Sequence, residues 1–225
     1  MAIDIQATDH FALGANFHAQ SSTSPHMEDM ANIKDELGNM ECETAINGRT
    51  EYSTTYRYCN ATPDIATDLG DALTAFGDLL NSICPTSLEV SFEAGQYATV
   101  VLSGVQYDDN AISVDIGSAD VSAAIPASAG FGVPSLPGVT LGTDASPSAL
   151  SISFSLEHKP AQGSDGNHFT SSNTTFKADA NAEYLGVPTT LEPVTGWTTD
   201  SYDTPDSNEE HDSAAWTGHR YFDKA

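Results

Sequence analysis

The sequence predicts a mainly β protein: an antiparallel β-sandwich or a curved sheet, with one flanking α-helix over about residues 63–84 and long loops. Two observations indicate this class. Over most of the stretch 87–186, apolar residues alternate with polar ones, which is the pattern of strands that bury one face. One clear helical stripe stands beside these strands, and a single helix needs a sheet to cover it. We expect residues 1–225 to form a single β-rich domain.

The amino-terminal 40 residues predict short strands followed by a short helix. Apolar residues alternate loosely up to residue 23, which favours one or two strands. Ser24-Pro25 is typical of a helix start, because proline at the first helical position has no amide hydrogen to leave unpaired. The apolar residues that follow at helical spacing are Met27, Met30, Ile33 and Leu37. They predict a helix that ends at Gly38.

Residues 40–58 predict a β-hairpin. Alternating residues lie on both sides of Asn47-Gly48. This dipeptide favours a two-residue hairpin loop, because both central residues of that turn need a positive φ. In the register that the turn sets, Cys42 lies opposite Ser53, well away from Cys59.

The chain has three cysteines, Cys42, Cys59 and Cys84, and no CxxC spacing. A disulfide between the first two would need an oxidising compartment and a close approach of their Cα atoms. The predicted hairpin does not bring them together. We therefore expect three reduced and mostly buried thiols.

The clearest helix is predicted over about 63–84. Thr62 is a typical N-cap residue, proline suits the first turn at 63, and Pro85 ends the helix. One apolar stripe runs along it and consists of Ile65, Leu69, Ala72, Leu73, Phe76, Leu80 and Ile83. We expect this stripe to pack on the flank of the sheet.

Two segments interrupt the predicted strands after residue 87. Residues 126–147 are rich in proline and glycine, which predicts an extended excursion. Residues 159–173 contain a cluster of Gly, Asp and Asn, which predicts a long flexible hairpin loop.

The stretch 198–225 predicts an acidic carboxy-terminal extension. Its carboxylates include Asp200, Asp203 and Asp206, a weak candidate cluster for a hard metal ion. Their spacing is not that of an EF-hand, so a solvated acidic loop is the preferred interpretation and no metal site is predicted. Trp216, Tyr221 and Phe222 lie in the same stretch, and three aromatic residues predict that it docks on its own domain or on a neighbour.

The charge balance excludes a nucleic-acid-binding protein. Seven Lys and Arg residues stand against 32 Asp and Glu, giving a formal net charge of −25. A surface with so few cations cannot hold phosphates, and it has no basic patch for an anionic membrane. The sequence contains neither GxSxG nor HExxH. We therefore expect a non-enzymatic protein without a cofactor and without a membrane partner.

These features together resemble the tail tube proteins of tailed viruses: a hairpin, one flanking helix, a β-sandwich with a long loop, an acidic balance and no catalytic motif. The resemblance lies in architecture and charge, over the whole chain. It implies a virion structural protein, made in the host cytoplasm, whose subunits associate into rings, expected to be hexameric, and contact other tail proteins. In that family, DNA passes through a negatively charged channel without specific binding.

A channel of this kind predicts carboxylates along one face of a strand. Glu41 and Glu43 point to the same side if residues 40–46 form a strand. Glu89 and Glu93 likewise share one side of the strand predicted after the helix. These four are the channel-lining candidates. Salt adaptation in a halophile is a second cause that would also deplete bases, and the sequence leaves both causes open.

The alternative function is a capsid-decorating module or a receptor- or glycan-binding β-sandwich. A row of tyrosines in the predicted hairpin could stack sugars: Tyr52, Tyr56 and Tyr58. Packing across strands is the commoner use of such a row.

Overall fold

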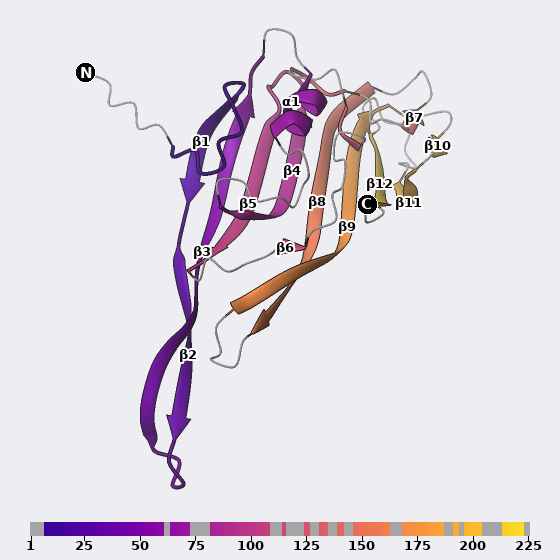
Figure 1. Cartoon of the computed structure of the whole chain (residues 1–225). Coiled ribbons are helices and arrows are strands. Elements are labelled where there is room, and N and C mark those ends of the chain that lie inside the picture. Colours follow the sequence, from indigo (N-terminus) through magenta and orange to yellow (C-terminus); the bar gives the residue numbers. More distant parts are fainter. Residues whose placement is uncertain are drawn as a thin grey trace, which may run out of the picture.

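A computed structural model of the chain describes residues 7–60, 64–72, 82–108, 114–115, 124–126, 131–134, 139–141, 146–162, 168–186, 191–193, 196–203 and 213–222. The prediction of a mainly β protein is confirmed, since one large sheet and one short helix account for most of these residues. The sheet has ten strands and is antiparallel except for one short parallel pair (Figure 1).

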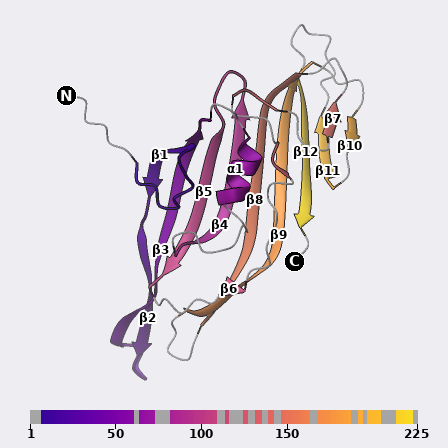
Figure 2. The same ribbon diagram turned by 45° about the horizontal axis from the view of Figure 1, so that its top comes forward.

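The strands of the large sheet are β1 (Phe17–Thr23), β2 (His26–Lys34), β3 (Met40–Tyr58), β4 (Cys84–Glu93), β5 (Thr99–Tyr107), β6 (Val114–Asp115), β8 (Ser146–Gln162), β9 (His168–Leu185), β11 (Thr198–Asp203) and β12 (Ser213–Phe222). Their order is β1-β3-β5-β4-β8-β9-β12-β11, with β2 paired to β3 and β6 to β9 (Figure 2). A separate two-stranded sheet joins β7 (Val139–Leu141) to β10 (Leu191–Pro193). Most of the predicted excursion at 126–147 lies outside the described residues.

The predicted helix after Ser24-Pro25 is wrong, because these residues form strand β2. β2 pairs along the first half of β3, with Met30 opposite Ala45 and Ile33 opposite Cys42. The backbone N–H and C=O groups of β2 pair with those of β3, whereas in a helix they would pair with one another. Tertiary pairing therefore overrides the local spacing of the apolar residues.

The turn of this hairpin lies at 35–39, whereas the sequence predicted it at Asn47-Gly48. The Asp35 carboxylate accepts hydrogen bonds from the backbone N–H groups of Leu37 and Asn39, at 2.9 and 2.7 Å, and from the Asn39 side chain. These bonds, that of the Asn39 side chain first, lower the pKa of Asp35. Gly38 takes the positive φ, 83°, that the turn requires.

Gly48 lies inside β3, beside an irregularity in the β2–β3 register. Its carbonyl accepts a hydrogen bond of 2.9 Å from the N–H of Asp108. A Cβ atom at position 48 would collide with the Asp108 carboxylate. That carboxylate is the mobile end of an exposed side chain, so the contact favours glycine without requiring it. The Asn-Gly dipeptide does not form a turn because β3 is paired on both sides of it, with β2 before and with β5 after.

Two hairpins project beyond the body of the sheet at the same end (Figure 1). The first, named here the β2–β3 arm, comprises residues 26–48; β5 pairs with β3 only from Arg49 onward. The second is the far part of β8 and β9. The predicted loop at 159–173 is therefore largely paired strand, with Lys159 opposite Ser172 and Gln162 opposite His168. Residues 163–167 lie outside the described chain.

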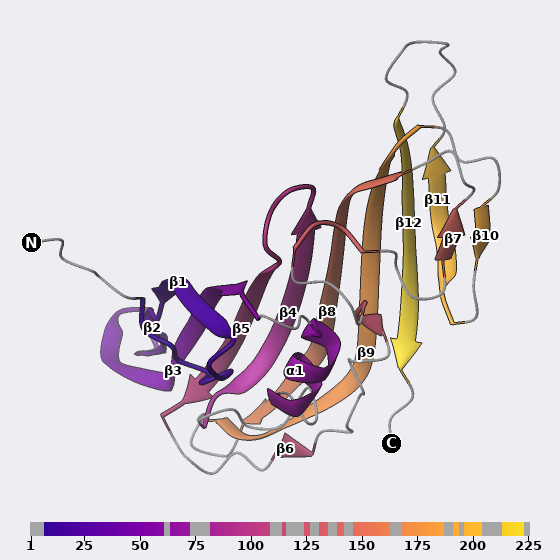
Figure 3. The same ribbon diagram turned by 90° about the horizontal axis from the view of Figure 1, so that it is seen from above.

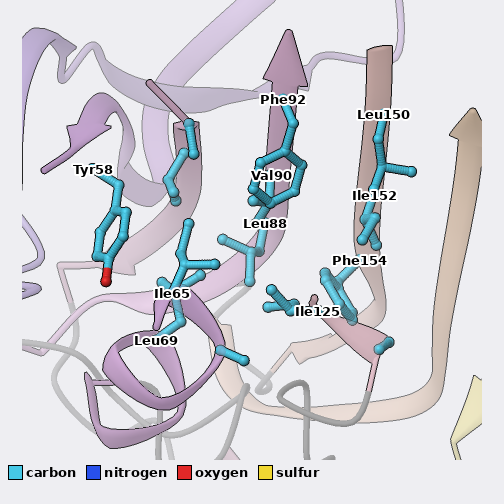
Figure 4. Packing of buried hydrophobic residues seen from close by; sticks show 14 of the residues in the cluster. Tyr58, Ile65, Leu69, Leu88, Val90, Phe92, Ile125, Leu150, Ile152 and Phe154 are labelled. Atoms are coloured by element: carbon cyan, nitrogen blue, oxygen red, sulfur yellow. The ribbon is translucent and has the colours of Figure 1, made fainter. Parts of the chain in front are cut away.

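The core lies on one face of the sheet, beneath helix α1 (Ile65–Ala72) (Figures 3 and 4). Ile65 and Leu69 of the helix are fully buried, and they face the apolar side chains of β4 and β8. Those side chains are Leu88, Val90 and Phe92 from β4 and Leu150, Ile152 and Phe154 from β8. Residues 73–81 of the predicted helix lie outside the described chain, but its predicted end is wrong, since Cys84 begins β4.

Two tyrosines of the β3 row belong to the core, and the third, Tyr52, is half-buried and packs against it. Tyr56 and Tyr58 are fully buried, so they pack inside the protein and present no sugar-stacking surface. The Tyr56 hydroxyl donates to Asp9 at 2.6 Å, and the Tyr58 hydroxyl donates to Asp68 of α1 at 2.6 Å. Burial, followed by the bond to its carboxylate partner, raises the pKa of each tyrosine.

The carboxy-terminal stretch completes the sheet of its own domain. β12 pairs with β9 over ten residues, and β11 pairs with β12. Trp216 is fully buried, and its indole N–H donates to the Thr199 hydroxyl at 3.1 Å. Trp216 and Phe222 therefore pack within their own domain, whereas Tyr221 remains exposed.

Candidate functional site: the open face of the sheet

The face of the sheet opposite α1 is open to solvent over β4, β8 and β9. From Ser87 onward the burial alternates in β4, with Leu88, Val90 and Phe92 inside and Glu89 and Glu93 exposed. Residues 150–155 of β8 and 177–185 of β9 alternate in the same way. This follows from the pleat, which sends successive side chains to opposite faces. We call the outward positions of these strands and of β3, β5, β12 and β11 the open face.

Hydroxyl groups and carboxylates dominate the open face. One row crosses four strands as Ser53, Ser103, Ser87 and Ser155. The acidic residues on the face include Glu51, Glu89, Glu93, Asp179, Glu183 and Asp203. Such a surface offers many hydrogen-bonding groups and a negative potential, and it offers a polyanion little to bind.

A row of carboxylates runs along one end of the open face, the end that lies away from the β2–β3 arm and from the projecting part of β8 and β9. Glu93 pairs with Ala149, Ala149 with Glu183, Glu183 with Ala215, and Ala215 with Asp203. Three acids are thus spaced by small residues across five strands. The alternation at 176–184 could have placed Glu183 on this face from the sequence. Asp203 could not have been found, because its strand was predicted as an extension outside the sheet.

The four predicted channel-lining residues fall in two separate places. Glu89 and Glu93 lie together on the open face, as the pleat predicted. Glu43 is exposed on the β2–β3 arm, opposite Asn32, and Glu41 lies in the same part of β3. The structure therefore does not bring Glu41 and Glu43 to the surface that carries Glu89 and Glu93.

Basic residues near the open face are held by acidic neighbours. The Lys177 ammonium lies 2.6 Å from Asp179, and the hydrogen bond to that carboxylate raises the pKa of Lys177. The Arg49 guanidinium lies 3.4 Å from both Asp29 and Glu51. These pairs leave less free positive charge than the count of bases suggests.

The weak metal candidate is not assembled by the described residues. Asp200 and Asp203 both lie on β11, and Asp206 lies outside the described chain. The Asp200 carboxylate instead contacts His219 Nδ1, which lies 2.8 Å away on the neighbouring strand β12. Over the described ranges, no three His, Cys, Asp or Glu side chains form a group suited to a metal ion.

A cavity of about 450 Å³ lies at the base of the β2–β3 arm. Hydroxyl groups of Thr23, Ser53, Thr86 and Ser103 line it, together with Arg49, Glu51 and Tyr107. Tyr107 is buried, and burial raises its pKa. No local sequence pattern predicts this cavity, because its lining comes from four strands and from the segment between β1 and β2.

The three cysteines are free thiols in three different settings. Cys42 is exposed on the β2–β3 arm, Cys59 is exposed just beyond the other end of β3, and Cys84 is buried. Seventeen residues of extended chain separate the first two, about 55 Å at the rise of a strand. A disulfide between them within one chain is excluded on this geometry. The prediction that most of the thiols are buried is wrong.

Comparison with known proteins adds no relationship to this geometry. No model of a protein family matches the sequence, and no curated protein matches it either. Among the helices that the structure describes, none has the length and apolar character needed to cross a membrane.

Proposed function

We propose that this chain is a non-enzymatic structural subunit of a virion, a ring-forming tail tube protein whose open face lines a channel for DNA. The observation that carries the proposal is a broad sheet with a core on one side and a face of hydroxyls and carboxylates on the other. DNA carries about one negative charge per 1.7 Å, so a wall of this kind repels it at every position and lets it slide.

Free strand edges supply a means of closing a ring. In the described chain, β1 and β11 stand at the two ends of the strand order. Neither contains a lysine or a proline, two of the devices by which edge strands avoid pairing with other chains. Pairing of β11 in one subunit with β1 in the next continues the sheet around a ring, and a hexamer is the ring that we propose.

Electron microscopy of the purified protein tests the ring. We expect rings or tubes with a central hole at high protein concentration, with the open face on the inner wall. Monomers under all conditions, or rings with the open face outward, contradict the proposal.

Charge reversal on the open face tests the channel. Replacing Glu89 and Glu93 together by lysine places two cations per subunit on the inner wall, and we expect DNA ejection from virions to slow at least tenfold. The matched control is Glu41→Lys with Glu43→Lys, which makes the same charge change on the arm. Ejection at the wild-type rate with the first variant, or equal slowing with both, removes the channel assignment.

Glycan binding is the second candidate, and the cavity at the arm base is the observation that favours it. Hydroxyl groups, an Arg–Glu pair and a tyrosine ring form the kind of lining that binds neutral sugars. Titration of the protein with neutral mono- and disaccharides, followed by calorimetry or NMR, tests it. No binding at millimolar concentrations contradicts this candidate and leaves the first untouched.

A further inference from the structure

Of the eight large apolar side chains that the described residues leave exposed, seven gather at two ends of the molecule, and the eighth, Tyr221, lies between these ends on β12. Four lie on the β2–β3 arm: Met27, Met30, Met40 and Leu37, the last of which is 86% exposed. Three lie at the opposite end of the sheet: Tyr97, Phe131 and Leu185. Apolar groups gathered in this way mark surfaces that contact another protein.

The end opposite the arm carries a fixed aromatic pair. Tyr97 and Phe131 are joined by a β-bridge, and their rings meet edge to face with centroids 5.2 Å apart. The N–H of Gly132 donates to the Gln96 carbonyl at 2.8 Å, which holds the two segments together. Both rings nevertheless remain exposed, Phe131 to 62%. The pair is therefore preorganised for a partner that the isolated chain does not supply.

We infer that the β2–β3 arm of one copy docks on the Tyr97–Phe131 end of a second copy, head to tail. The partner is a second copy because each chain carries both halves of the contact at opposite ends of one sheet. A contact of this type repeats from copy to copy and builds a filament or a stack. The inference rests on the proposed function, since it names the contact between successive rings.

The arm has the reach and the chemistry for this contact. Residues 40–47 lie beyond the last contact with Asp108, have β2 as their paired strand and extend about 25 Å beyond the sheet. The arm of one copy therefore reaches the facing end of the next copy without any movement of the sheet. Methionine side chains adapt their shape to aromatic surfaces and make favourable sulfur–aromatic contacts.

Charge opposes the contact, so the apolar side chains must hold it. Acids on the arm outnumber its single base, Lys34; they are Glu28, Asp29, Asp35, Glu36, Glu41 and Glu43. The receiving end carries the carboxylate row that begins at Glu93. Because salt screens this repulsion, we expect docking to strengthen as the NaCl concentration rises.

The two exposed thiols test the arrangement in the unmodified protein. Cys42 lies on the arm, and Cys59 lies beside the receiving end, since the N–H of Tyr58 donates to the Ala98 carbonyl. A short bismaleimide cannot span the two within one chain. We expect it to give a covalent ladder of oligomers that disappears in Cys42→Ser and in Cys59→Ser. A ladder that persists in either variant overturns the head-to-tail contact.

Point variants separate this contact from ring formation. Met30→Asp and Phe131→Asp should each reduce stacking at least tenfold, measured by sedimentation and microscopy, while circular dichroism stays unchanged. The matched control Asn32→Asp adds the same charge to the arm without removing an apolar group. Met30→Leu and Phe131→Leu keep an apolar side chain and should preserve most of the stacking.

The outcomes distinguish the two proposals. Separate rings in Met30→Asp and Phe131→Asp, with stacked rings in the wild type and in Asn32→Asp, support the contact. Normal stacking in both aspartate variants overturns it and leaves the ring proposal standing. Filaments without rings that both variants abolish support the contact and contradict the proposed function. A wild-type chain that stays monomeric and uncrosslinked in high salt contradicts both.

Discussion

Asp68 joins helix α1 to the sheet through a single carboxylate oxygen. This oxygen accepts hydrogen bonds from Tyr58 at 2.6 Å, Asn16 at 2.9 Å and Asn60 at 3.0 Å. Burial acts to raise the pKa of Asp68, but the hydrogen bonds from Tyr58, Asn60 and Asn16 lower it on balance. Three segments of the chain are therefore held in place by one ionised group.

We expect Asp68→Asn to lower the free energy of unfolding by about 1 kcal/mol, because the charged acceptor of these bonds is lost. The folded-state pKa of Asp68 is depressed, so its contribution is present above the unfolded pKa, about 4, and is lost as pH falls through the folded value. Urea unfolding at several pH values measures this. Glu89→Gln, an exposed change from acid to amide, is the control and should cost less than about 0.5 kcal/mol. Equal costs for the two variants would contradict the assigned role.

Thiol reactivity follows burial at each cysteine. We expect a maleimide or a disulfide reagent to modify Cys42 and Cys59 rapidly in the folded protein and to spare Cys84. Burial raises the pKa of Cys84 to about 11, so its reactive thiolate is scarce at neutral pH. Counting modified sites by mass spectrometry, before and after denaturation, checks this. Rapid modification of all three sites in the folded state would show that β4 does not shield Cys84.

At the scale of elements, the β2–β3 arm lies outside the core. Among the arm side chains that the structure describes, none belongs to the buried clusters. Where the arm begins, the N–H of Glu51 in β3 already donates to the carbonyl of Pro25, just after β1, at 3.0 Å, which is the closing hydrogen bond that a shorter hairpin would need. Replacing residues 26–50 by Asn-Gly should therefore leave a folded protein that is destabilised by about 1–2 kcal/mol. Thermal unfolding followed by circular dichroism measures the change, and complete loss of the cooperative transition would contradict it.

Long alternating strands could be predicted from the sequence, and the hairpin that forms the arm could not. β4 and the described side chains of β8 and β9 show the period of two because one face of each is buried, whereas β5 carries a continuous apolar run from Val100 to Leu102. The described side chains of β2 are not buried, so no period marks this strand, and its apolar residues lie at helical spacing by chance. The turn at Asp35 depends on side-chain hydrogen bonds that composition alone did not reveal.

The candidate site could be predicted in part. Glu89 and Glu93 share a face because one pleated strand carries both. The row that adds Glu183 and Asp203 depends on strand order, and no local pattern states which strands become neighbours. The same holds for the cavity at the arm base, whose lining comes from several strands.

At the scale of the whole molecule, the formal net charge of −25 predicts a marked dependence of stability on salt. We expect the unfolding midpoint to rise by roughly 5 °C between about 0.1 M and about 1 M NaCl, because salt screens repulsion among the carboxylates. A variant with glutamine at 41, 43, 89 and 93 has a formal charge of −25 + 4 = −21 and should show a weaker dependence. Equal midpoints in low and high salt for the parent protein would contradict this account.

The strand order also bears on how the chain is made. In the large sheet, β1, β2, β3 and β5 lie on the β4 side of the β4–β8 pair, and β9, β11 and β12 lie on the β8 side. During synthesis, the strands of the amino-terminal half can therefore pair with one another while one edge of β4 is still unpaired, because β8 has not yet been made. That edge carries Leu88, Val90 and Phe92, which are buried in the finished protein. The interval before β8 leaves the ribosome is the period in which the nascent chain is most open to pairing with the wrong strand.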